Sequence, residues 1–384
     1  MDNVNRSRMP PPEVVRAKPI EIRVRGDFVD WLEQSAGTLA ATTYNSGKLA
    51  LFSATGGELA TSFWRFPRPM GLAYAGGRLA IASQQHICVY RLANEHGTSH
   101  EIPPVPSPRW GGLGRGEEAG TRVAPLPSPP HKGEGVGEFL FSSNRIAFCR
   151  EAVHFTGKVD THDLAFDRRG LVFVNTRFNC IARPSERVSF LRSWQPWFVD
   201  GIQRKDCCHL NGVGIRAGRV AMATAFCERG APAAWRDSDR LQSGVLIDVR
   251  RNAIAARGLC MPHSPRWHEG GWWFCDSGRG ALCRLPGTAA EWNEAAVLPG
   301  FTRGLTFAAG RAIVGLSRIR KKHILDAPPV RQRFPRMRSG LWLVDPATGR
   351  TTGSLEFVRG GREVYDAAFL PNVKRLELVA SEGA

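Results

Sequence analysis

The residues of this sequence that could take part in chemistry recur at one place in a repeated pattern. Each copy of the pattern is an apolar run, a turn that contains glycine or asparagine, and a second apolar run. The residues that directly precede the six copies are Met70, His162, Asn211, His263, Arg303 and Tyr365. Because the copies share one register, we expect these side chains to lie at equivalent places around a common space.

A divalent metal ion is one group that such side chains suit. Two residues earlier, on the same face of an extended strand, stand Asp160, His209 and Met261. Imidazole nitrogens and carboxylate oxygens are usual ligands of divalent ions. The candidate metal ligands are Asn211, His162, His209 and His263.

The same set also suits acid–base chemistry on a small polar ligand. In that interpretation the catalytic residues are His162, His263 and Arg303, with Arg303 holding an anion. Ligand binding would fall to His209, Asn211, Tyr365 and Asp160. A purely structural alternative is that these side chains hydrogen-bond one another and seal a channel.

The repeats themselves indicate the fold. The six copies begin at Gly71, Asp163, Gly212, Ser264, Gly304 and Asp366. Their alternating apolar residues have a period of two, which indicates strands rather than helices. Hairpins spaced by roughly 40–60 residues are typical of β-propeller blades. We therefore predict an all-β fold, a six-bladed β-propeller.

The two ends of the chain together supply one blade. Residues 38–62 form an outer hairpin with no copy before it, whereas the last copy has no outer hairpin after it. A blade that combines both would close the ring and leave no open sheet edge between the first and last blades. Residues 26–384 are expected to form this single domain.

Two segments are predicted to stay outside the propeller. Of the residues 103–137, 16 of 35 are Pro or Gly, which is typical of a disordered segment, so we expect a low-complexity insertion at 97–138. The alternative interpretation of this insertion is a functional lid. Residues 1–25, rich in Arg and Pro, are expected to be a poorly ordered tail.

Composition and charge limit the partners and the cellular locations that we expect for this protein. The net charge is +17, and most of the 52 basic residues are Arg. They are scattered along the chain, which disfavours nucleic acid as a partner. The sequence shows no secretory signal and no apolar stretch that would span a membrane, so a cytoplasmic protein with nine reduced cysteines is expected. Cys207 and Cys208 match no cysteine signature and are interpreted as core residues.

Several of these motifs resemble an uncharacterised bacterial family of conserved hypothetical proteins that contain a domain of unknown function, some of them attached to tetratricopeptide repeats. The resemblance covers about 40–384 apart from the insertion, and it implies a β-propeller without indicating an activity. The runs that carry it are Asp160-Thr-His-Asp-Leu-Ala-Phe, Phe173-Val-Asn-Thr-Arg-Phe-Asn-Cys, Cys208-His-Leu-Asn-Gly-Val, Gly258-Leu-Cys-Met-Pro-His-Ser-Pro-Arg-Trp, Asp276-Ser-Gly-Arg-Gly and Leu298-Pro-Gly-Phe-Thr-Arg-Gly-Leu.

A more distant resemblance links the Asn-Gly pair at Asn211 to the gluconolactonase, regucalcin and strictosidine-synthase-like propellers. It implies that Asn211 helps to hold a divalent cation at the channel mouth and that the activity is a metal-dependent, lactonase-like hydrolysis. The expected partner is a small polar molecule. The alternative is a non-catalytic scaffold whose partner is another protein.

The insertion gives the first testable prediction. Deleting residues 100–136 should change the melting temperature little, because a flexible loop adds little closure entropy and few contacts. Differential scanning calorimetry of the parent and the deletion variant measures this. A fall of several degrees would mean that the segment packs on a blade.

Overall fold

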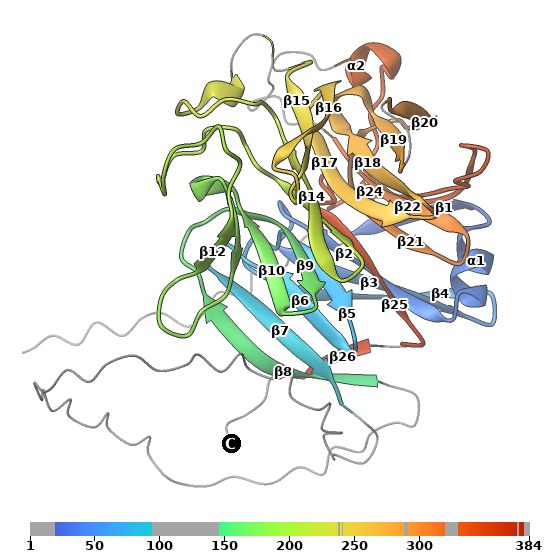
Figure 1. The fold of residues 1–384 in the computed structure, drawn as a ribbon. Helices are drawn as coiled ribbons and strands as arrows, with labels where there is room; N and C mark the ends of the chain where they lie inside the picture. Colours follow the sequence, from blue (N-terminus) through green and yellow to red (C-terminus); the bar gives the residue numbers. More distant parts are fainter. Residues whose placement is uncertain are drawn as a thin grey trace, which may run out of the picture.

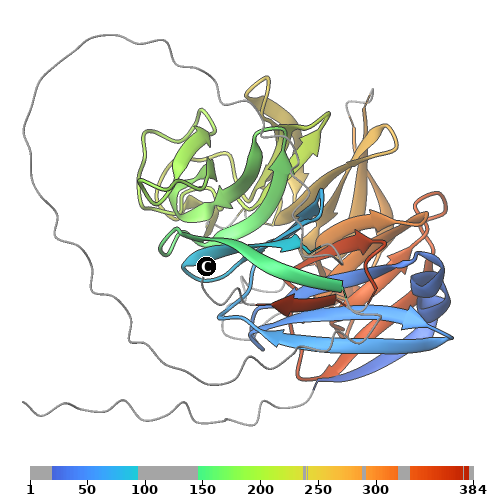
Figure 2. The same ribbon diagram turned by 90° about the horizontal axis from the view of Figure 1, so that it is seen from below.

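Six small antiparallel sheets stand around a common centre, so the predicted six-bladed propeller is confirmed (Figures 1 and 2). The structure is a computed structural model that describes residues 20–93, 146–236, 239, 241–287, 291–318, 329–374 and 376–379. The predicted insertion at 97–138 lies outside the described residues, as do residues 1–19 of the expected tail. In the described part of the chain, no helix is long and apolar enough to cross a membrane.

The first three blades follow one another along the chain, each from its inner strand outward. Blade 1 consists of β5 (Leu72–Ala75), β6 (Arg78–Ala82), β7 (His86–Leu92) and β8 (Ile146–Phe155). Blade 2 consists of β9 (Thr161–Asp167), β10 (Gly170–Asn175), β11 (Cys180–Arg183) and β12 (Leu191–Trp194). Blade 3 consists of β13 (Gly212–Arg216), β14 (Arg219–Ala225), β15 (Gly244–Asp248) and β16 (Ala253–Leu259).

The next two blades continue the same order. Blade 4 consists of β17 (Pro262–His268), β18 (Gly271–Asp276), β19 (Ala281–Pro286) and β20 (Asn293–Val297). Blade 5 consists of β21 (Phe301–Ala308), β22 (Arg311–Ser317), β23 (Gly340–Val344) and β24 (Thr351–Arg359). Short helices connect some strands: η1 (Thr176–Phe178), η2 (Ala234–Arg236), η3 (Ser277–Arg279) and α2 (Val330–Arg333).

Blade 6 combines both ends of the chain, as predicted. Its inner strand β25 (Asp366–Pro371) pairs with β2 (Gly37–Thr43), followed by β3 (Lys48–Thr55) and β4 (Glu58–Arg65). Two further strands, one from each end of the chain, each add a strand to another blade. Strand β1 (Glu21–Gly26) pairs with β24, and β26 (Leu376–Val379) pairs in parallel with β8.

Strand β1 corrects one expectation. Residues 21–25 were included in the poorly ordered tail, but they pair in register with blade 5. The alternation of Ile22 and Val24, whose side chains pack on the adjacent core, explains this pairing. Helix α1 (Phe28–Gln34) follows, and its Phe28, Trp31 and Leu32 are buried at the spacing of one helical face.

The hydrophobic core is divided into six clusters, one between each pair of neighbouring blades. Alternation within a strand produces this division, because successive side chains point to opposite faces of a sheet. In β2, Leu39 and Ala41 pack toward blade 5, whereas Ala40 packs toward blade 1. A strand of continuous apolar residues is therefore buried on both faces.

The inner strands are joined by side chains at the first residue of each repeat. This residue is Asp163 in blade 2, Ser264 in blade 4 and Asp366 in blade 6. Each of these side chains accepts a hydrogen bond from a backbone amide of the next blade. Blades 1, 3 and 5 begin with glycine instead. A Cβ atom on Gly304 would lie 2.8 Å from Cα of Asp366, so glycine allows the strands to approach.

Arg266 joins these positions across the channel. Its guanidinium donates to both carboxylate oxygens of Asp163 at 3.0 Å and lies 3.8 Å from Asp366. It also donates to the backbone oxygens of Val213 and Leu305. Residues of blades 2, 3, 5 and 6 are thus held by one side chain from blade 4. Burial and the neighbouring Asp163 raise the pKa of Asp366 to about 7.

Replacing this arginine should destabilise the fold strongly. In Arg266→Met two carboxyl groups stay buried without a counter-charge, so unfolding at pH 7 should require about 3–5 kcal/mol less. The difference in free energy of unfolding between the parent and the variant should be smaller at pH 5, where Asp366 is protonated. Urea denaturation followed by tryptophan fluorescence measures it. Arg78→Met, which removes an exposed ion pair with Glu151, is the control and should change stability by about 1 kcal/mol or less.

Candidate functional site

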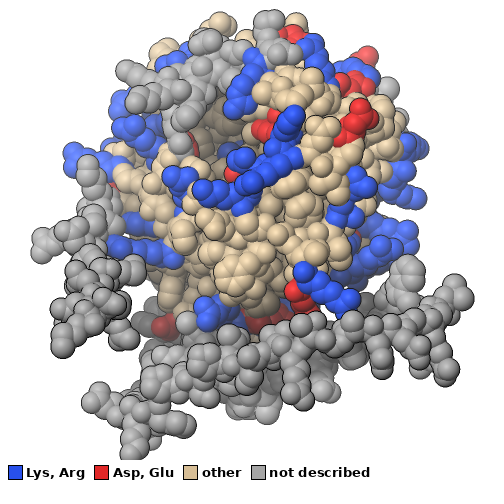
Figure 3. All heavy atoms as spheres, turned by 90° about the vertical axis from the view of Figure 1, so that its left-hand side faces the viewer, with Lys and Arg blue, Asp and Glu red and all other residues tan. Residues whose placement is uncertain are grey.

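A pocket of about 580 Å³ opens at the end of the channel where the inner strands begin. We call it the mouth pocket. Loops of blades 2 and 3 supply most of its wall, and the face that carries these loops is hollowed in Figure 3, with Lys and Arg side chains around the hollow. The pocket is lined by Tyr44, Met70, Asp160, His162, Thr176, Arg177, Lys205, Asp206, His209, Pro232, Ala233, Trp235, Arg236 and Tyr365.

Two histidines are held by the same local device in blades 2 and 4. Nδ1 of His162 lies 2.8 Å from the carbonyl oxygen of Asp160 and 2.7 Å from the hydroxyl of Thr176. In blade 4, Nδ1 of His263 lies 3.0 Å from the carbonyl oxygen of Met261 and 2.8 Å from the hydroxyl of Ser277. A left-handed backbone at the residue two positions before each histidine, with φ of 54°, turns that carbonyl toward the ring.

These contacts fix the tautomer of both rings. The Thr176 hydroxyl donates to the carbonyl oxygen of Leu210, so it accepts from His162. Nδ1 therefore carries the hydrogen, and Nε2 keeps a lone pair. Burial, together with His209 and Arg303, holds the pKa of His162 well below its usual value. Burial and Arg303 lower the pKa of His263 in the same way, so both rings are neutral acceptors at pH 7.

His209 is positioned differently, by a carboxylate. Its Nδ1 donates to Asp206 Oδ2 at 2.7 Å, and its backbone amide donates to Asp206 Oδ1 at 2.9 Å. The ring packs against both Phe226 and Trp235, with centroid distances of 4.5 and 4.4 Å. The His162 ring stands edge-on to it at 4.8 Å. His209 thus has a counter-charge for an imidazolium, which neither of the other two histidines has within hydrogen-bond distance.

Arg303 lies against the pocket wall without a carboxylate partner. Its guanidinium carbon is 3.5 Å from the centroid of Tyr365, which lines the mouth pocket. Within the described residues it forms no ion pair, and its Nε is buried without a hydrogen-bond partner. By contrast, Arg177 at the pocket rim donates to Asp160 at 3.0 and 2.7 Å. Arg303 is therefore a half-buried cation whose charge is not balanced locally.

Two of the candidate metal ligands, Asn211 and His209, hydrogen-bond protein atoms through their side chains. Oδ1 of Asn211 accepts a hydrogen bond from the Thr224 hydroxyl at 2.6 Å, and the side chain is buried outside the lining of the mouth pocket. Nδ1 of His209 is bound to Asp206. No three His, Cys, Asp or Glu side chains in the described ranges are grouped so that they could hold one ion.

The structure brings together only part of the predicted set. Asp160, His162, His209 and Tyr365 line the mouth pocket, as does Met70. His263 is buried deeper and contacts Phe226 and Phe301. Arg303 lies behind Tyr365, and Asn211 is enclosed in blade 3. The mouth pocket is lined by residues of blades 1, 2, 3 and 6, so the residues at the same register in blades 4 and 5 lie outside it.

Sequence reasoning missed the groups that orient the rings. Thr176 and Ser277 both follow the second strand of a blade, in the runs Asn175-Thr-Arg-Phe-Asn and Asp276-Ser-Gly-Arg-Gly. Aligning the second strands as well as the first would have placed both hydroxyls beside the histidines. Lys205 and Trp235 lie in irregular loops that no repeat covers.

The cysteines of this region are buried thiols, as predicted. Cys207 and Cys208 are fully buried, and burial raises the pKa of both. All nine cysteines are free. Because the thiolate is the reactive form, these two residues are poor nucleophiles at neutral pH.

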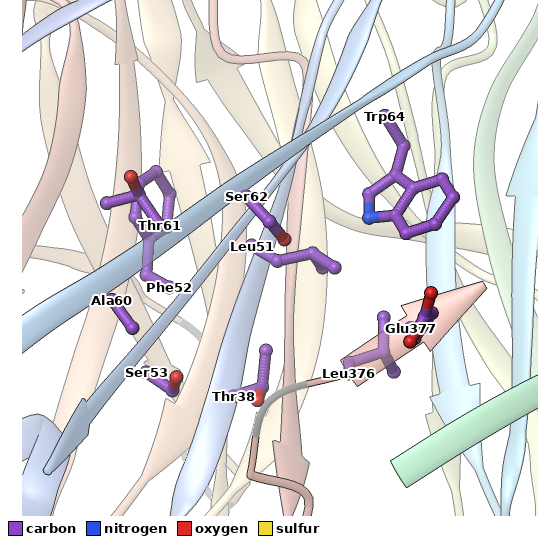
Figure 4. Close-up of a pocket in the computed structure, with 10 residues that line it drawn as sticks. All are labelled: Thr38, Leu51, Phe52, Ser53, Ala60, Thr61, Ser62, Trp64, Leu376 and Glu377. Atoms are coloured by element: carbon purple, nitrogen blue, oxygen red, sulfur yellow. The ribbon is translucent and has the colours of Figure 1, made fainter. Parts of the chain in front are cut away.

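A separate cavity of about 330 Å³ lies between β26 and blade 6 (Figure 4). Its wall contains Leu51, Phe52 and Trp64 with several hydroxyl side chains, and Glu377 stands at β26. None of the candidate site residues predicted from the repeats lines this cavity.

Comparison with known proteins identifies a family and a fold. The family model for a domain of unknown function (DUF4915) matches residues 142–379. No curated protein matches the chain. A solved structure, "Crystal structure of Nidogen/Laminin Complex", contains a chain with a TM-score of 0.50 and 10% identity; the match covers 88% of this chain and 99% of that chain. At such low identity the likeness concerns the fold alone.

The neutral histidines predict how stability depends on pH. On unfolding, His162 and His263 regain an ordinary pKa near 6.5 and take up protons below it, so the free energy of unfolding should fall as pH drops from about 6.5 to 5. Each contributes up to about 1.4 kcal/mol per pH unit. His263→Gln should be less stable at pH 7 but should show a shallower fall. Urea denaturation at both pH values measures this, and parallel curves for parent and variant would contradict it.

Proposed function

Because this chain belongs to the family of the domain of unknown function DUF4915, its role has to be inferred from its site, and we propose that the mouth pocket binds a small hydroxylated anion such as a hydroxy-carboxylate. The uncompensated Arg303 is the observation that carries this proposal. A buried or half-buried cation without a partner is unfavourable unless a ligand supplies the opposite charge.

Further cations support an anionic ligand. Lys205 and Arg236 line the pocket, and the Arg236 guanidinium lies 3.8 Å from the Trp235 ring centroid. The two lining carboxylates are both engaged, Asp160 by Arg177 and Asp206 by His209. The charge available to a ligand is therefore positive, and a carboxylate is attracted through charge-assisted hydrogen bonds.

The histidines indicate which hydrogen-bonding groups the ligand carries besides its negative charge. Nε2 of His162 can only accept, because Nδ1 carries the hydrogen. Acceptors inside a pocket require donors on the ligand, and hydroxyl groups supply them. Met70, Trp235 and Tyr365 add apolar surface to the lining, which the carbon skeleton can contact.

If a reaction occurs in the pocket, His209 is the residue suited to take the proton. Its imidazolium would be stabilised by Asp206, as in other carboxylate–histidine pairs. His162 and His263 lack such a carboxylate, and Arg303 opposes their protonation. This reverses the assignment made from the sequence, in which His162 and His263 were catalytic and His209 bound ligand.

The binding proposal is tested on Arg303. Arg303→Met should weaken binding of hydroxy-carboxylates at least about tenfold, because it removes the charge that attracts the anion. The same change should leave stability equal or slightly higher, since an unbalanced charge is lost. Isothermal titration calorimetry with glycolate, malate, tartrate and gluconate measures the first effect, and thermal melting measures the second.

Arg250→Met, at an exposed turn in blade 3, is the matched control and should bind like the parent. The proposal fails if the parent binds none of these anions, or if Arg303→Met binds them as the parent does. A large loss of stability in Arg303→Met would instead support the structural alternative, a polar seal.

A further inference from the structure

Four exposed arginines gather on the face opposite the mouth pocket. Arg168 and Arg169 form the turn between β9 and β10, and Arg216 and Arg219 flank the turn between β13 and β14. The two hairpins touch, because the Arg168 amide donates to the carbonyl oxygen of Gly218 at 2.9 Å. We call these four residues the arginine cluster.

The cluster is unfavourable for the isolated protein. Arg216 and Arg219 are directly opposite each other in the β13–β14 pair, and like charges at such positions destabilise a hairpin. The Arg168 side chain lies over Gly218, where a Cβ atom would come within 2.6 Å of its Cγ. Within the described ranges, none of the four arginines forms an ion pair with a carboxylate. The four positive charges therefore lie close together, and an anionic group of another molecule would stabilise them.

A cavity of about 310 Å³ opens beside the cluster, at the end of the channel where the inner strands finish. We call it the second-mouth cavity. One large apolar side chain from each blade lines it, always the fourth residue of the repeat: Tyr74, Phe166, Ile215, Trp267, Phe307 and Phe369. Arg216 joins the two features, because its guanidinium carbon lies 3.8 Å from the Trp267 ring centroid.

We propose that the arginine cluster and the second-mouth cavity together dock an acidic segment of a partner protein. Acidic side chains of that segment pair with the arginines, and one large apolar side chain enters the cavity. The inner end of the cavity suits an apolar group, because Arg266 there is already bound to Asp163 and to backbone oxygens. Charge complementarity selects the partner, and the cavity selects one residue within it.

Other occupants fit these features less well. A second copy of a chain with a net charge of +17 would bring like charges together. Single-stranded nucleic acid binds through bases stacked on aromatic faces, but Arg216 already covers the Trp267 ring. Asp163 and Asp366, which lie behind the cavity wall, also oppose the entry of a phosphate group.

The test uses a fluorescein-labelled peptide with a central tryptophan between two runs of glutamate, and fluorescence anisotropy with the full chain. The double variant Arg216→Glu, Arg219→Glu should bind it at least about tenfold more weakly than the parent. Arg250→Glu, Arg251→Glu, which changes charge equally at the next hairpin of the same blade, should bind within about twofold of the parent. A peptide with serine in place of tryptophan should bind several-fold more weakly.

A stability measurement separates docking from a structural role. Arg219→Glu places opposite charges across the hairpin, so its melting temperature should equal or exceed that of the parent while peptide binding falls. A clear loss of stability in this variant would mean that the arginines serve the fold, and the proposal would be wrong.

Further results would also overturn docking at this surface. One is equal weakening by the two double variants, and another is equal binding of the tryptophan and serine peptides. A third is preference for a labelled single-stranded oligonucleotide over the peptide. Arg303→Met should leave peptide binding unchanged, and loss of binding in that variant would place the peptide in the mouth pocket. The docking proposal and the proposed function therefore fail separately.

Discussion

The ion cluster of Arg266, Asp163 and Asp366 is the interaction on which the other features depend. Six sheets that pack only through apolar faces could rotate or slide relative to one another, because such packing has little directional preference. The guanidinium contacts carboxylates and backbone oxygens of blades 2, 3, 5 and 6, and Asp366 accepts a hydrogen bond from the Leu72 amide of blade 1, so the cluster fixes the relative positions of the sheets. Arg266 is also almost enclosed, with 21% of its side chain exposed. Arg266 lines the second-mouth cavity but not the mouth pocket, so the two cavities have different linings.

The mouth pocket and its surroundings show how residues at similar places in the repeat acquire different chemistry from different hydrogen-bond partners. His162, His209 and His263 come from three consecutive blades, yet their environments differ. Backbone carbonyls and hydroxyls fix two of them as neutral acceptors, whereas Asp206 prepares the third to hold a proton. An uncharged acceptor beside an ionisable one gives a site both directional recognition and the means to move a proton.

The sequence was sufficient for the fold because the fold is periodic. Gly71, Asp163 and the four equivalent residues mark the inner strands, and turn residues between apolar runs mark the hairpins. The pairing of β1 with blade 5 was missed because Glu21–Gly26 is short and precedes every repeat. The site was harder to predict. Register placed His162 and Asn211 at equivalent positions, but only the three-dimensional structure shows that Thr224 binds Oδ1 of Asn211 and that Asp206 lies beside His209.

The composite blade has a consequence for the protein during its synthesis. Strands β2, β3 and β4 leave the ribosome long before their inner neighbour β25. The hydroxyl of Thr42 and the amide of Asp366, which bond at 3.0 Å, are 324 residues apart. Until β25 has been translated, the nascent chain therefore carries an apolar sheet whose β2 edge has no partner. Such an edge can pair with another chain, so the growing polypeptide depends on chaperones or dilution until the ring closes.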